Sequence, residues 1–217
     1  GCNLSCQYCD TPVKSTPHCR VELIPGSGIF QEYPNPLSLG DTMAILDQLR
    51  PGRHHSISLT GGEPLLSVVF VKELLPLVRA AGLPVYLETN GTLPDKLQEV
   101  ISMVDIISMD IKIPTAAYCG DNWDRHREFL KVAGQKKVFV KAVVTGDTSD
   151  EEIRQAAALI KDIDPAIPLV LQPATPGTDN RFRPPDAKRV IDIQDLALLI
   201  LPDVRVIPQT HIYMGQL

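Results

Sequence analysis

The sequence has no uninterrupted apolar run of the roughly 18 residues that a membrane-spanning helix requires, so no transmembrane segment is predicted. It also has no excess of positive charge, because 21 Lys and Arg stand against 26 Asp and Glu, a formal net charge of −5. An acidic chain is not attracted electrostatically to nucleic acid or to anionic membrane surfaces. Neither is therefore expected as a partner.

A secretory signal and a disulfide framework are also missing. No signal peptide precedes the cysteines, and five cysteines are an odd number with no evident pairing pattern. We therefore expect a reducing, cytoplasmic location. The chain contains no internal repeat and no low-complexity linker. Its 217 residues, 44% of them hydrophobic, can bury one large core, which predicts a single domain over residues 1–217.

The most informative stretch lies at residues 1–11, where Cys2, Cys6 and Cys9 form a C-x₃-C-x₂-C pattern. Three thiols in one short loop cannot all pair as disulfides. Thiolates are soft ligands suited to iron–sulfur clusters or to zinc. A structural zinc site would need a fourth ligand, which His18 or Cys19 could supply. A 4Fe–4S cluster on three thiolates would instead leave one iron free to bind another molecule.

Hydrophobic periodicity predicts an α/β protein. Strands are expected at 56–59, 85–89, 105–111, 137–145, 167–172 and 204–208, and helices at 38–49, 66–81, 93–103, 124–133, 148–163 and 185–201. Ser38 is expected to cap the first helix, and Thr148 with Glu151 to form a capping box. Residues 12–37 hold five of the 19 prolines and predict an irregular insertion. Alternating strands and helices favour a parallel sheet with right-handed crossovers.

Polar residues follow almost every predicted strand. They comprise Thr60 to Glu63, Glu88 to Gly91, Asp110 with Lys112, Gln172, and Gln209 to His211. In parallel (β/α) barrels the chemistry gathers at the carboxyl ends of the strands. These residues are therefore expected to line one shared pocket.

The cysteine spacing, followed by a strand that ends in Gly61-Gly62-Glu63-Pro64, resembles the signature of the radical S-adenosylmethionine (SAM) superfamily. The resemblance implies a partial (β/α) barrel in which SAM chelates the open iron of a 4Fe–4S cluster and is cleaved to a 5′-deoxyadenosyl radical. A first strand should precede the cysteines in such a barrel. We therefore expect the sequence to be truncated at its N-terminus and to lack that strand.

Further stretches resemble the 7-carboxy-7-deazaguanine synthase family of queuosine biosynthesis. They are Cys9-Asp10-Thr11-Pro12, Glu88-Thr89-Asn90-Gly91-Thr92, Met109 to Pro114, and Pro208-Gln209-Thr210-His211. The family implies conversion of 6-carboxy-5,6,7,8-tetrahydropterin to 7-carboxy-7-deazaguanine by radical ring contraction with loss of ammonia, a lyase reaction that regenerates SAM. It also implies Mg²⁺, a reductase such as flavodoxin or ferredoxin, and a homodimer.

The same resemblance implies roles for individual residues. Cys2, Cys6 and Cys9 would ligate the cluster, Thr11 would bind Mg²⁺, and Thr60 and His211 would contact substrate. The residues that would bind SAM are Tyr8, Asp10, Gly61, Gly62, Glu63, Asn90, Asp110, Ile111, Lys112, Gln172, Pro173, Ala174 and Thr175. Two alternatives remain open: a glycyl-radical-enzyme activase, and a zinc-binding structural module. The roles of Cys19 and Cys119 are also open.

Overall fold

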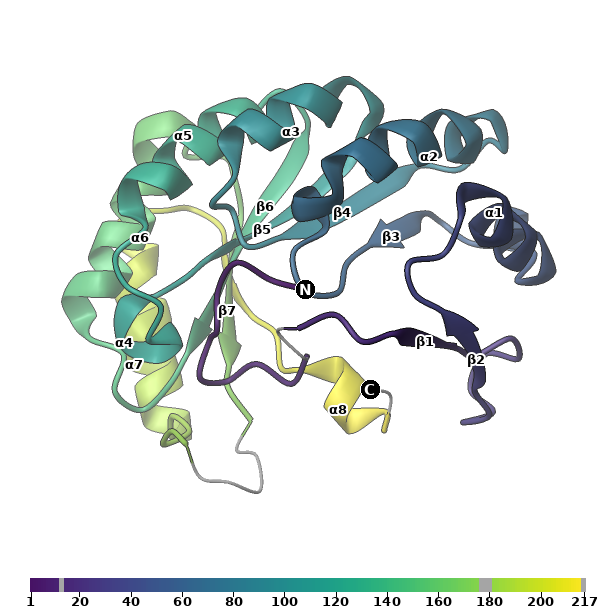
Figure 1. The fold of residues 1–217 in the computed structure, drawn as a ribbon. Helices are drawn as coiled ribbons and strands as arrows, with labels where there is room; N and C mark the ends of the chain where they lie inside the picture. Colours follow the sequence, from purple (N-terminus) through teal and green to yellow (C-terminus); the bar gives the residue numbers. More distant parts are fainter. Residues whose placement is uncertain (12–13, 176–180, 216–217) are drawn as a thin grey trace.

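The computed structural model describes residues 1–11, 14–175 and 181–215, and its main feature is a curved parallel sheet (Figure 1). The six strands run in the order β3-β4-β5-β6-β7-β8, so every hydrogen-bonded neighbour in the sheet is also the next strand in the chain. Their bounds are β3 (Ile57–Leu59), β4 (Val85–Thr89), β5 (Ile106–Ile111), β6 (Lys137–Val144), β7 (Leu169–Pro173) and β8 (Val204–Val206). All six predicted strands and the parallel arrangement are confirmed, and the sheet forms an open, partial barrel.

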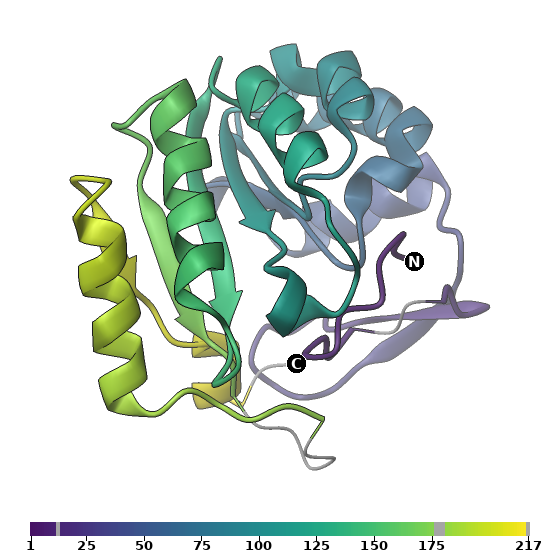
Figure 2. The same ribbon diagram turned by 90° about the vertical axis from the view of Figure 1, so that its left-hand side faces the viewer.

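Helices cover the outer face of the sheet (Figure 2). The larger ones are α1 (Leu39–Gln48), α2 (Val68–Ala80), α3 (Pro94–Val100), α5 (Trp123–Ala133), α6 (Asp150–Ile163) and α7 (Ala187–Leu198). The short elements are η1 (Pro51–Arg53), η2 (Pro64–Ser67), η3 (Ile101–Met103), α4 (Pro114–Ala117) and α8 (Thr210–Tyr213). The six predicted helices are confirmed, whereas α4 and α8 were not predicted. None of the helices in the described ranges is long and apolar enough to cross a membrane.

The helix caps follow the sequence only in part. Ser38 caps α1 as expected, because its hydroxyl accepts a hydrogen bond from the Asp41 N–H at 3.1 Å. The predicted capping box of α6 is wrong by one residue, since Ser149 and Glu152 form it. The hydroxyl of Thr148 instead accepts a hydrogen bond from the Thr145 N–H at 2.9 Å. Thr148 therefore stabilises the turn after β6.

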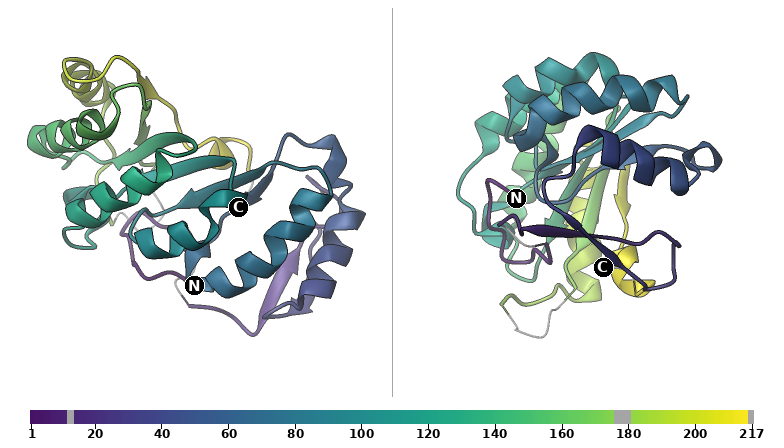
Figure 3. Two further views of the ribbon diagram at one scale, coloured as in Figure 1. Left: turned by 90° about the horizontal axis from the view of Figure 1, so that it is seen from above. Right: turned by 45° about the vertical axis from the view of Figure 1, so that its right-hand side comes forward.

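The prediction that residues 12–37 are irregular throughout is also wrong. Strand β1 (His18–Val21) pairs antiparallel with β2 (Gln31–Pro34). Proline is tolerated in such a two-stranded hairpin because each strand has one edge that needs no hydrogen-bonding partner. The guanidinium of Arg20 lies over the Phe30 ring, 4.2 Å from its centroid, and supports the pairing. The hairpin lies beside α1, away from the helical layer of the sheet (Figure 3).

The two faces of the sheet differ in polarity. On β4, Val85 and Leu87 are buried in the hydrophobic core beneath the helices, whereas Tyr86 and Glu88 alternate with them and face the inside of the curve. Because parallel neighbours are in register, Glu88 lies beside Ser108 of β5. Asp110 likewise lies beside Lys141 of β6. The inner face of the partial barrel is therefore polar where the outer face is apolar.

Candidate functional site

The loop of residues 1–11 lies across the carboxyl ends of several strands (Figure 2). At the end of β3, the Glu63 N–H donates to the Gly1 carbonyl at 2.9 Å. Beyond β5, the Gln7 N–H donates to the Ala117 carbonyl at 3.0 Å. A Cβ on Gly62 would overlap the Gly1 carbonyl, so the close approach of the two segments requires glycine at this position.

The three cysteines of this loop are free thiols with different surroundings. The sulfur of Cys2 accepts hydrogen bonds from the Leu4 N–H at 3.4 Å and from the Asn90 amide at 3.7 Å. Cys6 is buried near Cys119, and the Cys119 thiol, together with burial, raises the pKa of Cys6. Cys9 lies beside the Thr11 carbonyl, with its sulfur 3.5 Å from that oxygen.

In the ranges that the structure covers, no three His, Cys, Asp or Glu side chains are grouped so as to hold a metal ion. The three cysteines share one loop, which contacts the ends of β3 and β4 through Gly1 and Cys2. Their convergence on a metal is not seen, and their ligand role stays a prediction. His18 and Cys19, the fourth ligands considered for zinc, belong to β1. Among the described residues, neither is part of a group of three side chains that could hold a metal ion.

Glu63 joins the end of β3 to the end of β4. Its buried carboxylate accepts hydrogen bonds from the Asn90 N–H at 2.8 Å and from the Thr89 hydroxyl at 3.0 Å. A third hydrogen bond comes from the Leu65 N–H at 3.1 Å. Burial raises the pKa of Glu63, and these donors partly oppose the rise. The side chain of Glu63 therefore fixes the protein backbone, and its main-chain N–H meets the cysteine loop.

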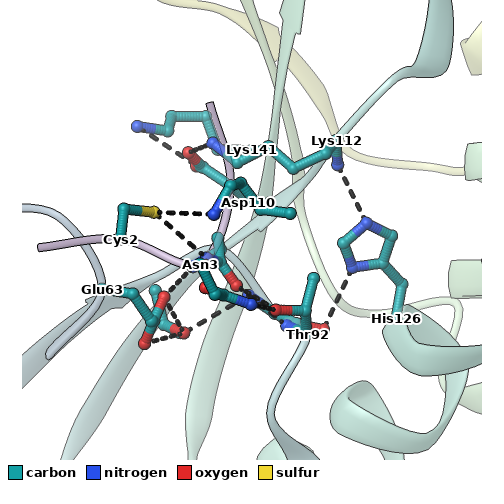
Figure 4. Close-up of polar contacts among 12 residues, drawn as sticks. Cys2, Asn3, Glu63, Thr92, Asp110, Lys112, His126 and Lys141 are labelled. Atoms are coloured by element: carbon teal, nitrogen blue, oxygen red, sulfur yellow. Dashed lines mark hydrogen bonds and ion pairs between the residues drawn. The ribbon is translucent and has the colours of Figure 1, made fainter. Parts of the chain in front are cut away.

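A network of three polar side chains fixes the turn after β4 against the cysteine loop (Figure 4). The Asn90 amide donates to Asn3 Oδ1 at 2.8 Å, and the Asn3 amide donates to the Thr92 hydroxyl at 2.9 Å. That hydroxyl donates to Asn90 Oδ1 at 2.6 Å and closes the ring. Asn90 was predicted as a site residue, whereas Asn3 and Thr92 were not. Two signals were available in the sequence: Asn3 follows the predicted ligand Cys2, and Thr92 follows the predicted turn at Asn90-Gly91.

A partly buried charge cluster lies on the inner face of β5 and β6 (Figure 4). Asp110 is paired with Lys112 at 2.7 Å and with Lys141 at 3.2 Å. Burial alone would raise the pKa of Asp110, but the two ammonium groups bring it below its usual value. Burial would lower the pKa of Lys112, but Asp110 raises it well above its usual value. The cluster therefore carries two cations and one anion.

The aromatic ring of Tyr8 brings the cysteine loop to this cluster. The Lys112 ammonium lies 5.5 Å from the centroid of the Tyr8 ring. Ile111 behaves differently from its neighbours, because its side chain is fully buried in the core. Only the backbone of Ile111 is available to a ligand on the inner face. Lys141 was missed by the sequence analysis, although strand alternation and the register with Asp110 place it there.

His126, on α5, connects two of these strand ends and was also missed. Its ring is fully buried. Nε2 accepts a hydrogen bond from the Lys112 N–H at 3.1 Å, and Nδ1 lies 3.1 Å from the Gly91 carbonyl, to which it donates. Burial lowers the pKa of His126 to about 4, so the ring is neutral at physiological pH.

The last strands contribute the remaining predicted residues. His211 Nε2 lies 3.1 Å from the Asp10 carboxylate, although 201 positions separate them in the chain. The Thr175 N–H donates to the Gln209 side chain at 2.7 Å, and Gln172 Nε2 donates to the Pro208 carbonyl at 3.5 Å.

Four other predicted residues differ in exposure. Thr60 and Gly61 are exposed at the end of β3, and Ala174 is buried after β7. Pro173 ends β7 and is half-buried. The Thr11 hydroxyl donates to Asp10 Oδ1 at 3.3 Å. The strand-end residues therefore lie along one edge of the sheet, and the expectation that they line one shared pocket stays a prediction.

Comparison with known proteins agrees with this geometry. The sequence profile of the Radical SAM superfamily matches residues 1–160. The chain is 46% identical over 221 residues to the 7-carboxy-7-deazaguanine synthase of Geobacter sulfurreducens, covering 100% of this chain and 87% of the relative. It is 35% identical to the 7-carboxy-7-deazaguanine synthase of Thermococcus kodakarensis, over 81% of this chain and 72% of the relative.

Solved structures show a similar fold at low sequence identity. Streptococcus suis SuiB bound to S-adenosylmethionine superposes with a TM-score of 0.64 and 14% identity, covering 96% of this chain and 45% of SuiB. A radical SAM methyltransferase from Sphaerobacter thermophilus gives a TM-score of 0.62 at 16% identity, over 79% of this chain and 58% of the other. These likenesses concern the fold alone.

Proposed function

The chain belongs to the radical SAM superfamily and, within it, to the 7-carboxy-7-deazaguanine synthases, and on that premise we propose how its own residues serve that reaction. The enzyme converts 6-carboxy-5,6,7,8-tetrahydropterin to 7-carboxy-7-deazaguanine. The pyrazine ring contracts and one ammonia leaves, so the atoms balance without a further reactant. The observation that carries the proposal is the docking of the cysteine loop onto the Gly-Gly-Glu segment, through Gly1 and Glu63.

The donor set fits a 4Fe–4S cluster, which the family implies together with SAM. Cys2, Cys6 and Cys9 are all free, all in one loop, and all soft ligands, and three thiolates leave one iron open. When bound, the cluster and SAM supply a carbon-centred radical that removes a hydrogen atom from the pterin. The chain holds the thiolates on a loop that is fixed to the ends of β3, β5 and β8.

We propose that SAM lies along the same strand ends. Gly61 and Gly62 allow close approach of the backbone, Asn90 presents an amide, and Tyr8 presents its ring. The Lys112 and Lys141 ammonium groups exceed the charge of Asp110 by one, which suits an anionic group of a ligand on the inner face. Asp10, Glu63, Ile111, Gln172, Pro173, Ala174 and Thr175 complete the proposed SAM site.

Substrate and Mg²⁺ belong to the outer part of the same edge. Thr60 is exposed at the end of β3, and His211 contacts Asp10 in the cysteine loop. The Thr11 hydroxyl beside the Asp10 carboxylate supplies the hard oxygen donors that Mg²⁺ prefers, with substrate oxygens and waters completing the shell. We further propose a flavodoxin or ferredoxin as electron donor, a homodimer, and a cytoplasmic location.

Anaerobic reconstitution with iron and sulfide tests the proposal. The protein should acquire a brown chromophore, and with a reductant and SAM it should convert the tetrahydropterin to a product of the mass of 7-carboxy-7-deazaguanine. The Cys6→Ala variant should lose both, whereas Cys19→Ala, which alters a thiol of the hairpin, should keep both. A colourless protein that binds stoichiometric zinc would contradict the proposal.

A second outcome separates this function from that of a glycyl-radical activase. An activase would contain the cluster and consume SAM, yet form no deazapurine from the pterin. Rapid loss of SAM without product would therefore reject the substrate while leaving the cofactor assignment intact.

A further inference from the structure

His126 occupies an unusual place for a buried histidine, because both of its ring nitrogens contact backbone atoms of different strand ends. Nε2 meets the N–H of Lys112 after β5, and Nδ1 meets the carbonyl of Gly91 after β4, each at 3.1 Å. The helix α5 that carries His126 covers the outer face of the sheet. The ring therefore reaches from the helical layer to the edge where the site lies (Figure 4).

The geometry fixes the protonation state of the ring. The Lys112 N–H can only donate and the Gly91 carbonyl can only accept, so the neutral ring protonated at Nδ1 satisfies both. A protonated imidazolium would place a second N–H against the Lys112 N–H. The ring is the hydrogen-bond partner of both the Lys112 N–H and the Gly91 carbonyl, so removing it would deprive two buried backbone groups of these hydrogen bonds.

The two bridged segments carry residues of the proposed SAM site. Asn90 precedes Gly91, and its side chain contacts Asn3 and Cys2 in the cysteine loop. The backbone N–H of Lys112 donates to His126, and the side-chain ammonium of Lys112 pairs with Asp110. Space around the bridge is tight, because a Cβ on Gly91 would lie 3.1 Å from His126 Nδ1 and 2.7 Å from the end of the Met109 side chain. The turn at Gly91 is therefore closely packed against the His126 ring.

We propose that His126 is a positioning residue that holds the turn after β4 and the segment after β5 at a fixed separation, so that Asn90 and Lys112 are arranged for SAM before SAM binds. The inference rests on the proposed function for the identity of the ligand. The bridge itself does not depend on that identity. His126 contacts no substrate and performs no chemistry.

The test compares four variants in the full chain. His126→Phe keeps the ring and removes both nitrogens. His126→Gln keeps one acceptor and one donor on a side chain of similar reach, and His126→Asn keeps an amide near Gly91 but is too short to accept from Lys112. Phe129→Leu, a buried residue of the same helix, is the matched control because it loosens packing and leaves both hydrogen bonds in place.

Two measurements follow for each variant. Hydrogen–deuterium exchange of the ligand-free protein should show faster exchange of the Lys112 amide in His126→Phe and His126→Asn than in Phe129→Leu. In the reconstituted protein, the SAM affinity of His126→Phe should fall roughly tenfold, the equivalent of one lost hydrogen bond of positioning. His126→Gln should recover most of both. The KM for SAM should rise more than kcat falls.

Equal SAM affinities in His126→Phe and Phe129→Leu at equal melting temperature would overturn the inference. If His126→Phe does not fold, His126→Asn decides, since unchanged Lys112 exchange and SAM affinity in that variant would reject the bridge. Failure of the parent protein to bind SAM would count against the proposed function instead, and the exchange result would then decide on the bridge alone.

Discussion

The neutral state of His126 has a consequence for the stability of the protein at low pH. Burial lowers its pKa from 6.5 to about 4 in the folded state. The unfolded chain therefore takes up a proton as the pH falls below about 6.5, whereas the folded chain does so only near pH 4. The contribution of neutral His126 to the free energy of unfolding is therefore fully present above pH 6.5, and it is lost as the pH falls from 6.5 to about 4. A shift of this size corresponds to about 3 kcal/mol.

Chemical denaturation at several pH values checks this prediction. The unfolding free energy of the parent should fall by up to about 3 kcal/mol more than that of His126→Gln between pH 6.5 and pH 4. The variant is the reference for the effect of the carboxylates, because both proteins contain them. Carboxylates such as Asp110, whose pKa is lowered in the folded state, also destabilise the protein when they are protonated in acid. Parallel curves for the two proteins would contradict the pKa assigned to His126.

Outside the cysteine loop, the sequence pointed to individual site residues only where a predicted strand ends. Asn90, Asp110 and Lys112 lie at or just after the ends of strands with clear apolar alternation, so their place at one edge was predictable. His126 lies inside a helix, 14 positions from Lys112 and 35 from Gly91. Its role depends on how α5 packs on the sheet, which local patterns do not encode.

Glu152 serves two helices at once. Its carboxylate accepts from the Ser149 N–H at 2.9 Å in the capping box of α6. The same carboxylate accepts from the N–H and hydroxyl of Thr115 in α4. Glu152→Ala should therefore lower the unfolding free energy by about 1–2 kcal/mol, as measured by urea titration.

Glu151 is the matched control for this change, since it is adjacent, exposed and the partner that the sequence predicted. Glu151→Ala should change the unfolding free energy by less than about 0.5 kcal/mol. The sequence placed the start of α6 within one residue but could not choose between Thr148 and Ser149, because both hydroxyls precede a glutamate by three positions. Equal losses in the two variants would reject the observed box.

The cysteine loop depends on the absence of a side chain at Gly62. In Gly62→Ala the new Cβ would overlap the Gly1 carbonyl, at a cost of about 1–3 kcal/mol if the loop stays docked. We expect the loop to leave the end of β3 and the iron content after reconstitution to fall. Gly40→Ala is the control, because its Cβ would meet only the Ser38 hydroxyl at 3.8 Å. Normal iron loading in Gly62→Ala would show that the docking is dispensable.

The β1–β2 hairpin was not predicted because its strands are too short to show a hydrophobic period. Strands β1 and β2 have four residues each and lie among five prolines, so neither offers a measurable period. Their pairing becomes visible only in three dimensions, in the register of Cys19 with Tyr33. The longer strands of the sheet, such as β5 with six residues and β6 with eight, were predictable because each contains enough apolar positions to define a period.

His211 and Asp10 join the two ends of the described chain at the open side of the barrel. Both side chains are about half exposed, so their pairing contributes less than about 1 kcal/mol to stability. If His211 contacts substrate, His211→Ala should leave the melting temperature nearly unchanged and lower kcat/KM for the pterin about tenfold or more. His55, at the opposite end of the sheet, provides the control, and His55→Ala should change neither quantity.

The architecture of the six-stranded sheet was accessible from the sequence because every strand in it pairs with its neighbour in the chain. A parallel sheet of this kind needs no knowledge of distant pairings beyond right-handed crossovers. The contacts of the cysteine loop required more, since they join residues 1 to 63 and 10 to 211. The motif predicted the chemistry of the loop, while only the fold revealed the surfaces on which it rests.

The order of these contacts bears on how the protein is made. On the ribosome, Cys2, Cys6 and Cys9 leave the exit tunnel before any of the segments that later hold them. Gly62 and Asn90 follow, then Ala117, and His211 is the last of these residues to emerge. The thiols therefore emerge well before the segments that hold their loop, and delivery of iron and sulfide is best timed after His211 has left the exit tunnel.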